Sequence, residues 1–208
     1  MLEKYNLTAL VGRRLSGKST LLMKMLLSDE FNLKEQYDRV IFICPNFFLS
    51  DLYKLVQLPK NQIKTEYSNV FLNSLIEHQK RSNKEEILLI LDDCVSEKDF
   101  KSQDANHPLN KLATIGRHLH ISCILVSQKF SLLSTTIRAN LDYVFVFSTH
   151  NRNEREAIFN EIGIGSFREF NKVLDHVFTD PHKFLYYNAY ARTQTYHNGF
   201  TEMQIRLT

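Results

Sequence analysis

The sequence predicts an α/β fold with a mostly parallel central sheet. Short apolar runs alternate with longer helix-like segments, which is the order of strands and helices expected of a parallel sheet. The runs are continuously apolar, as is typical of strands that are covered on both faces. A glycine-rich loop also joins the first run to the first helix. The predicted strands are Leu7–Val11, Val40–Cys44, Ile87–Leu91, Ile121–Ser127 and Tyr143–Phe147.

The loop after the first strand fits the pattern Gly-x(4)-Gly-Lys-Ser, which is that of a phosphate-binding loop in its required strand–loop–helix setting. Its glycines allow backbone N–H groups to point inward as an anion nest, and the following helix adds its positive N-terminal end. Lys18 can reach the β- and γ-phosphates, and the Ser19 hydroxyl can hold Mg²⁺. A chance glycine turn is the alternative, but the flanking strand and helix favour binding of a nucleoside triphosphate. The residues expected to bind the nucleotide are Gly12, Arg13, Arg14, Leu15, Ser16, Gly17, Lys18, Ser19 and Thr20.

The periodicity predicts helices over Lys18–Leu27, Asn69–Arg81 and Leu109–His118. Residues 50–68 show no clear pattern, and Leu58-Pro59-Lys60-Asn61 indicates a surface turn within them. The stretch Glu97–Pro108 is polar and without a period, so it is expected to be a mobile loop beside the site.

The C-terminal part is expected to extend the sheet with antiparallel strands. Helices are predicted over Asn151–Ile162, ending at Gly163, and over Ser166–Leu174. Strand composition occurs at Phe184–Tyr190 and Gln204–Leu207, with a turn expected at His197-Asn198-Gly199. The chain of 208 residues is therefore expected to form one domain over 1–208, with a core at 7–147 and an extension at 151–208.

Composition limits the function classes only weakly. The formal charge of +3 allows a nucleic-acid partner without arguing for one. Cys44, Cys94 and Cys123 lack CxxC spacing, which favours reduced thiols and an intracellular location. No apolar segment reaches the roughly 18 residues that a membrane span needs, so no spanning segment is expected. The 9 tyrosines and 15 phenylalanines are spread along the chain and are interpreted as core rather than as a base-stacking platform.

Two acids follow the third predicted strand, Ile87–Leu91. In a protein with a phosphate-binding loop, an apolar strand that ends in acids is typical of the strand that holds magnesium. Asp92 is expected to hold Mg²⁺ through water, and Asp93 to orient or deprotonate the attacking water. The alternative is a strand that simply ends in a solvated turn. The loop at residues 12–19 favours the functional interpretation.

The strand at residues 40–44 bears on the subclass. In small kinases and GTPases the magnesium strand lies beside the phosphate-loop strand. An extra strand inserted between the two, together with a catalytic acid, resembles the additional-strand ATPases. We therefore interpret residues 40–44 as evidence for that arrangement.

Further candidates follow the acids. The strand Ile121–Ser127 precedes Gln128, whose amide can donate to a γ-phosphate oxygen and accept from the attacking water, as a sensor would. Its alternative is a polar strand end. Arg117 and Arg138 are candidates for an arginine finger supplied by a neighbouring subunit of a ring. A surface salt bridge or a DNA contact is nearly as good an explanation for each arginine.

Three motifs in order carry a family resemblance: Gly116-Arg117-His118, the strand ending Ser127-Gln128, and Ile137-Arg138-Ala139-Asn140. This order resembles the FtsK–HerA superfamily of P-loop DNA-pumping ATPases. Within it, the chain most resembles the poxvirus-type viral genome-packaging ATPases, and Ile41-Phe42-Ile43-Cys44-Pro45-Asn46 also matches that group. The resemblance spans residues 7–147, and the part from Asn151 has no matching motif.

The resemblance implies a three-layer RecA-like fold and a homo-oligomeric ring, a pentamer or hexamer, that uses ATP and Mg²⁺ to drive double-stranded DNA into a preformed capsid. It implies capsid or portal-vertex partners and a location in the host cytoplasm, a viral factory or the virion. By position, Lys18 and Ser19 bind phosphate and Mg²⁺, Asp92 binds Mg²⁺, Asp93 is the catalytic acid, Gln128 the sensor, and Arg117 or Arg138 the finger. Two residues depart from the family pattern: many relatives have Gly where Leu15 stands, and many additional-strand ATPases have Glu where Asp93 stands.

The sequence leaves three alternative functions open. The first is a cellular FtsK-like or HerA-like DNA motor, which the sequence distinguishes poorly from a viral packaging ATPase, although the short chain favours the viral interpretation. A small-molecule kinase would want an arginine-rich lid rather than a strand ending in Ser-Gln. A non-hydrolysing nucleotide switch would not need Asp93. For a DNA motor, the loops at Lys98–Lys101 and Lys129–Ser134 are the candidate DNA contacts.

Overall fold

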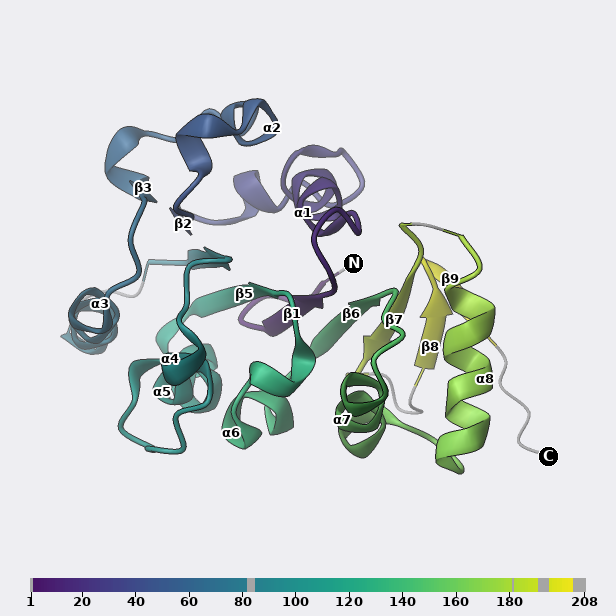
Figure 1. Cartoon of the computed structure of the whole chain (residues 1–208). Helices are drawn as coiled ribbons and strands as arrows, with labels where there is room; N and C mark the ends of the chain where they lie inside the picture. The colour runs from purple at the N-terminus through teal and green to yellow at the C-terminus, as the bar shows by residue number, and fades with distance from the viewer. Residues whose placement is uncertain (1, 82–84, 181, 191–194, 204–208) are drawn as a thin grey trace.

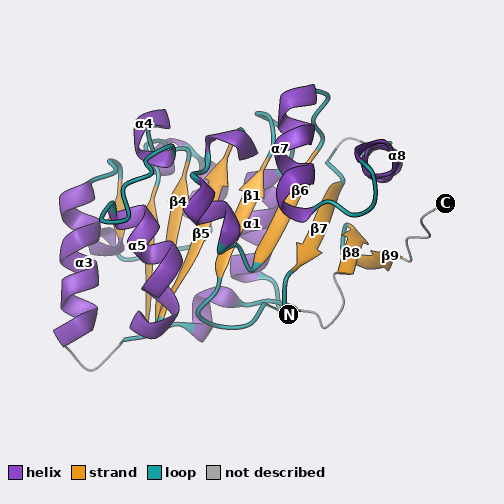
Figure 2. Ribbon diagram, turned by 90° about the horizontal axis from the view of Figure 1, so that it is seen from below, coloured by secondary structure: helices purple, strands orange, loops and turns teal. Residues whose placement is uncertain are grey.

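The computed structural model describes residues 2–81, 85–180, 182–190 and 195–203. In this part of the chain nine strands form one sheet in the order β3-β2-β4-β5-β1-β6-β7-β8-β9. Figures 1 and 2 show the sheet with helices packed on both of its faces. The strands are β1 (Leu7–Val11), β2 (Arg39–Ile43), β3 (Ile63–Lys64), β4 (Ile87–Asp92), β5 (Ile121–Ser127), β6 (Tyr143–Phe147), β7 (Phe184–Asn188), β8 (Thr195–Asn198) and β9 (Thr201–Met203).

Two apolar cores lie on opposite faces of the sheet. In β1, Ala9 and Val11 pack into one core, whereas Leu10 packs into the other, as expected when successive side chains of a strand point to opposite faces. The helices α1 and α2 cover the second core, and α3, α5, α6, α7 and α8 cover the first (Figure 1). The helices are α1 (Lys18–Leu27), α2 (Asp51–Lys54), α3 (Asn69–Arg81), α4 (Glu97–Phe100), α5 (Pro108–Ile115), α6 (Thr135–Ala139), α7 (Arg152–Ile162) and α8 (Phe167–Val177).

The α/β fold class is confirmed, and so are many boundaries. β1, β5 and β6 begin and end where the apolar runs do, and α1 and α3 match their predicted ranges. The predicted helix over 109–118 is shorter, because α5 ends at Ile115 and a 3-10 turn, Gly116–Leu119, follows it. Asn151 and Ser166 are N-caps of α7 and α8, and α8 continues past Leu174 because Val177 is buried as well.

The strand that separates the phosphate-loop strand from the magnesium strand is β5, so the assignment of that place to residues 40–44 is wrong. Parallel pairing sets Leu7 of β1 against Cys123, and Ile87 of β4 against Ile121. β2 instead pairs with the outer side of β4, with Arg39 opposite Ile87. The additional-strand arrangement is present, but the inserted strand comes from later in the chain.

The predicted antiparallel extension is confirmed. β7 pairs antiparallel with β6, β8 with β7, and β9 with β8. The hairpin between β8 and β9 turns at Gly199, whose φ is 64°, near the turn expected at 197–199. The strand predicted at 204–207 lies outside the described residues.

The three cysteines are free, as predicted. Burial raises the pKa of the Cys123 thiol to about 12, so this side chain behaves as a small apolar core residue. Among the helices of the described ranges, none is long and apolar enough to cross a membrane.

Candidate nucleotide-binding site

The two glycines of the loop are needed for different reasons. Gly12 directly follows β1, and its N–H donates to the Ser127 carbonyl over 3.1 Å. A Cβ at Gly12 would lie 2.5 Å from Cβ of Phe147, so the neighbouring strand leaves room only for glycine. Gly17 instead has φ of 104°, a backbone conformation that side chains rarely adopt, and it immediately precedes α1. Together they shape the loop and aim the helix N-terminus into it.

Leu15 also has a left-handed backbone, with φ of 62°, and its side chain is 94% exposed. This conformation is costly for any residue with a Cβ and free for glycine. The position therefore favours glycine on physical grounds, and this chain places a leucine there.

Lys18, the first residue of α1, is buried, with only 6% of its surface exposed. Its ammonium group donates to the carbonyls of Gly12 at 2.6 Å and Arg13 at 2.8 Å. Burial lowers the pKa of Lys18, and the charges of Asp93 and Asp92 oppose that shift. The ammonium thus folds back on the loop, where phosphate oxygens can replace the carbonyls as its partners.

The two acids at the end of β4 have different environments. Asp92 is buried, and burial raises the pKa of its carboxyl, an effect that the hydrogen bond from Tyr53 partly offsets. Asp93 is exposed and has a left-handed backbone, with φ of 46°. Because the chain turns at Asp93, one carboxylate points into the protein and the other lies at the open edge of the sheet. The edge is the carboxyl end of parallel strands, where ligands bind in such folds.

Gln128 and Asp93 are brought together as the sequence predicts. The amide nitrogen of Gln128 donates to Oδ2 of Asp93 over 3.1 Å. Gln128 directly follows β5, and β5 lies between β4 and β1. The predicted acid and the predicted sensor therefore lie at the same sheet edge as the phosphate-binding loop.

Ser19 and Asp92, the two predicted magnesium ligands, are joined through a residue that sequence reasoning missed. The hydroxyl of Tyr53 lies 2.9 Å from Oγ of Ser19 and donates to the carboxylate of Asp92. Mg²⁺ prefers oxygen ligands and is usually held by one or two protein groups together with substrate phosphates. The hydroxyl of Ser19 and the carboxylate of Asp92 are such oxygens, so the donor set fits Mg²⁺.

The predicted finger arginines lie elsewhere. Arg117 pairs with Asp142 over 2.8 Å and also donates to the hydroxyl of Tyr190. It lines a cavity with Asn6 at the start of β1, at the opposite end of the strand from the phosphate-binding loop. Within one chain, Arg117 is therefore not part of the site.

Arg138 is held by Phe130, which follows β5, and by Glu161 of α7. Its guanidinium lies 6.0 Å from the ring centroid of Phe130 and 3.6 Å from the carboxylate of Glu161. Its Nε is buried without a hydrogen bond. These contacts tie α6 to α7 and leave a role in a neighbouring subunit as a prediction.

A cavity of about 760 Å³ opens beside the phosphate-binding loop. Its walls combine Thr20 and Lys24 of α1 with four aromatic side chains: Phe147, His182, Phe184 and Phe200. Three of these aromatic residues come from the C-terminal extension. Phe147 and Phe184 are buried in the core, as the aromatic residues were expected to be, whereas Phe200 is 38% exposed. Nothing in their sequence spacing marks them, because the antiparallel pairing of β6, β7, β8 and β9 brings them to the loop.

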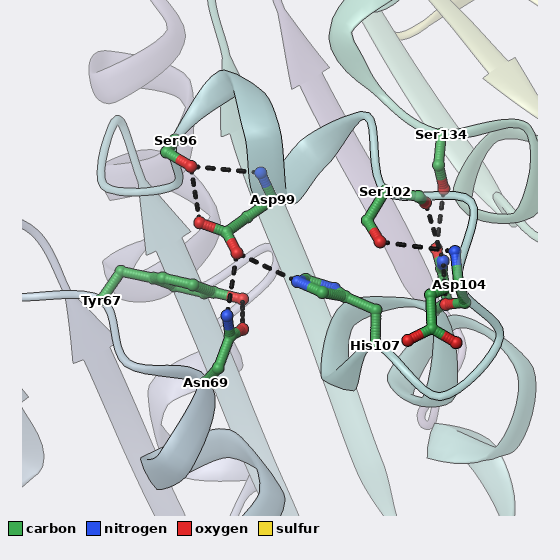
Figure 3. Close-up of polar contacts among 9 residues, drawn as sticks. Tyr67, Asn69, Ser96, Asp99, Ser102, Asp104, His107 and Ser134 are labelled. Atoms are coloured by element: carbon green, nitrogen blue, oxygen red, sulfur yellow. Dashed lines mark hydrogen bonds and ion pairs between the residues drawn. The ribbon is translucent and has the colours of Figure 1, made fainter.

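The stretch expected to be a loop after the acids contains α4, so the absence of regular structure predicted for 97–108 is wrong there. Figure 3 shows the polar contacts that hold it. Asp99 accepts from Asn69 at 2.8 Å and lies 3.0 Å from Nε2 of His107. Asn110 donates to the carbonyls of Ser102 and Asp104. The stretch is therefore bound to both α3 and α5.

A further contact joins this stretch to the loop after Gln128. The hydroxyl of Ser134 donates to the side-chain oxygen of Asn110 over 2.7 Å (Figure 3). The hydroxyl of Thr135 donates to the side-chain oxygen of Gln103. The stretch that follows α4 is thus held against the start of α6, next to the loop at 129–134.

Comparison with known proteins places the chain in a viral group. The family model described as "Poxvirus A32 protein" matches residues 1–180. The chain is 31% identical over 160 residues to the uncharacterized protein 075L of Invertebrate iridescent virus 6, and 26% identical over 177 residues to the uncharacterized protein 088R of Invertebrate iridescent virus 3. The matches cover 72% and 82% of this chain but only 57% and 65% of those proteins.

Solved structures share the fold. The DNA-packaging ATPase B204 from Sulfolobus turreted icosahedral virus superposes with a TM-score of 0.69 at 21% identity, covering 94% of this chain and 98% of that one. B204 of Sulfolobus turreted icosahedral virus 2, in complex with sulfate, gives a TM-score of 0.69 at 23% identity over 97% of this chain and 100% of that chain. Since the family model covers most of the sequence, the chain belongs to the Poxvirus A32 protein family.

Proposed function

We propose that the protein is a magnesium-dependent ATPase that moves double-stranded DNA into a preformed viral capsid. The observation that carries the proposal is the contact between Asp93 and Gln128 at the sheet edge that also holds the phosphate-binding loop. An acid and an amide at this edge support hydrolysis of a nucleotide whose phosphates lie on the loop. Membership of the Poxvirus A32 family and the fold shared with the DNA-packaging ATPase B204 support the same function.

The residues of the site divide between nucleotide binding and hydrolysis. The loop N–H groups and Lys18 bind the phosphates, while Ser19 and Asp92 would hold Mg²⁺. Bound Mg²⁺ would neutralise charge on the β- and γ-phosphates. Asp93 orients the attacking water and accepts its proton, and Gln128 keeps that carboxylate aligned over the 3.1 Å hydrogen bond.

The base of the nucleotide is placed in the aromatic cavity beside the loop. Base rings stack well on aromatic side chains, and the exposed side chains of His182 and Phe200 offer such surfaces in the cavity that Thr20 also lines. The cavity of about 760 Å³ has room for a nucleoside. Structures of B204 with AMP and with AMPPCP support nucleotide binding by this fold.

We assign DNA contact to the stretches 98–101 and 129–134. A motor must pass every sequence, so phosphate contacts by lysines suit it better than contacts to bases. Lys98 and Lys129 are exposed, whereas Lys101 pairs with Glu97. Because the loop at 129–134 follows Gln128 directly, a change at the γ-phosphate has a short route to the DNA.

We assign the active form to a homo-oligomeric ring in which Arg117 or Arg138 completes the site of the next subunit. Neither arginine reaches the site of its own chain, which is what a finger in trans requires. Capsid or portal-vertex proteins are the expected further partners, in the host cytoplasm, the viral factory or the virion.

The decisive experiment measures ATP hydrolysis with and without double-stranded DNA, with Lys18→Ala as the inactive control. Double-stranded DNA should raise turnover, and added salt should abolish the increase. Absence of stimulation at low salt, in a sample shown by gel filtration to be oligomeric, would overturn the DNA motor. A strict monomer whose ADP release depends on a small acceptor would instead identify a kinase.

A further inference from the structure

The side chain of Tyr53 lies where the two predicted magnesium ligands meet. Tyr53 belongs to α2, Ser19 to α1 and Asp92 to the end of β4. Its hydroxyl lies 2.9 Å from Oγ of Ser19 and is hydrogen-bonded to Oδ2 of Asp92. One phenol therefore touches both groups at once, although more than thirty residues separate it from each of them.

The single proton of the phenol decides the direction of these hydrogen bonds. An ionised carboxylate only accepts, so Tyr53 gives its proton to Asp92. The proton of Ser19 is then free to point at the phenol oxygen. When the proton of Ser19 points at the phenol oxygen, the lone pairs of the serine oxygen point away from Tyr53 and can bind a cation. The contact therefore orients both ligands.

The ring of Tyr53 is held firmly. Only 5% of the residue is exposed. Its ring lies 5.1 Å from that of Phe42 and 5.8 Å from that of Phe47, with an angle of 21° to the latter. Ser50 caps α2 by accepting from the N–H of Tyr53. To withdraw the hydroxyl, the chain would have to open this aromatic cluster, so the hydroxyl stays in place when a cation arrives.

We propose that Tyr53 is the positioning residue of the magnesium site, holding Ser19 and Asp92 in the orientation that binds Mg²⁺. This inference rests on the proposed function, because it assumes that a magnesium nucleotide binds at these residues. Cys44 cannot substitute for the phenol, since its sulfur is 3.8 Å from Asp92 and is a weak donor. Outer groups that orient metal ligands typically contribute about 10–100-fold to metal affinity.

The test compares Tyr53→Phe with Tyr37→Phe by binding of a fluorescent, non-hydrolysable ATP analogue over a range of free Mg²⁺ and in EDTA. Tyr37 is a matched control, because it also buries a hydroxyl in the same apolar core, hydrogen-bonded to Ser122 at 2.7 Å. We expect Tyr53→Phe to require about 10–100-fold more Mg²⁺ for the same affinity, with unchanged affinity in EDTA. Tyr37→Phe should alter neither value.

Each other outcome has a meaning. An unchanged Mg²⁺ requirement in Tyr53→Phe overturns the inference, and so does a lower requirement, which would show that the phenol competes with the cation. If the wild-type protein binds no nucleotide, or binds it equally well in EDTA, the proposed function fails first. Thermal unfolding without nucleotide establishes that the variants are folded.

A second variant covers a failure of Tyr53→Phe to fold. Phe47→Leu retains the hydroxyl but loosens the ring that supports it. We expect a smaller increase in the Mg²⁺ requirement in the same direction, and no increase would again overturn the inference.

Discussion

Gln128 donates a hydrogen bond of 3.1 Å to the carboxylate of Asp93, joining the residue after β5 to the residue after β4. The contact exists because β5 lies directly beside β4 in the sheet. Its consequence is that the acid and the amide act as a pair, so that disturbing either one displaces the other.

Asp93→Asn should keep nucleotide binding and lose turnover. Asparagine tolerates the left-handed backbone at φ of 46° and retains a hydrogen-bond acceptor, but it cannot accept the proton of the attacking water. We expect the turnover number to fall by about 10²–10⁴-fold. Single-turnover hydrolysis and analogue binding measure the two quantities. Turnover within threefold of wild type would assign the base elsewhere.

Gln128→Ala should uncouple hydrolysis from DNA. Without the amide, Asp93 loses its partner and the loop at 129–134 loses its link to the phosphates. We expect basal turnover to fall about tenfold, the loss of roughly 1.4 kcal/mol of alignment, and DNA stimulation to disappear. Gln103→Ala is the control, because Gln103 bonds to Thr135 outside the acid pair. Full stimulation in Gln128→Ala would contradict a sensor role.

Leu15→Gly should stabilise the protein. Leucine at φ of 62° is strained by roughly 1–2 kcal/mol, while the added freedom of glycine in the unfolded chain costs roughly 0.5–1 kcal/mol. The net gain is therefore about 0.5–1 kcal/mol in the free energy of unfolding by urea. Leu49→Gly provides the contrast, since Leu49 is 82% exposed but lies in a 3-10 helix without positive φ, and should lose stability. A loss in both variants would disprove the strain at Leu15.

Gly12→Ala should destabilise the folded protein, whereas Gly116→Ala should not. The new methyl group at residue 12 would meet Cβ of Phe147 at 2.5 Å, so β1 and β6 must separate. Overpacking of this kind costs roughly 1–3 kcal/mol and should also distort the phosphate-binding loop. At Gly116 the nearest atom lies at 3.4 Å, an ordinary contact. Urea unfolding of both variants tests the difference, and equal stability would show that the sheet yields at Gly12.

Asp99 should make the free energy of unfolding depend on pH. Burial raises the pKa of its carboxyl, but the hydrogen bonds from Ser96, Asn69 and His107 outweigh burial and lower the pKa overall. Because the pKa of Asp99 is lower in the folded than in the unfolded protein, its ionised carboxylate stabilises the fold at pH values above the unfolded pKa of about 3.9. This stabilisation is lost as the pH falls through the folded-state pKa. Asp99→Asn should cost about 1 kcal/mol at pH 7 and less below pH 4. A cost that grows on acidification would contradict this sign.

The sheet could be predicted from the sequence where burial on both faces leaves an unbroken apolar run, as in Leu7–Val11 and Ile121–Ser127. The loop at 12–19 could be predicted because all its chemistry is local. The order of the strands could not, because any apolar run can pair with any other: only the register of β5 with both β1 and β4 shows that it is the inserted strand.

The missed site residues share one cause. Tyr53 reaches Ser19 and Asp92 from a stretch without periodicity, and Phe200 reaches the cavity from a turn near the end of the described chain. Their roles come from tertiary contact across long sequence separations, which spacing alone does not encode. The acids and Gln128 could be found because each directly follows a recognisable strand.

The cavity beside the loop has one wall from α1 and another from the segment that begins at His182. In the proposed binding mode, the phosphate-binding loop, the two acids and Gln128 of one chain all lie before residue 129, while most of the cavity wall that would contact the base begins about fifty residues later. In that binding mode, substitutions in β7 and the β8–β9 turn should alter which base is bound without altering the catalytic rate constant.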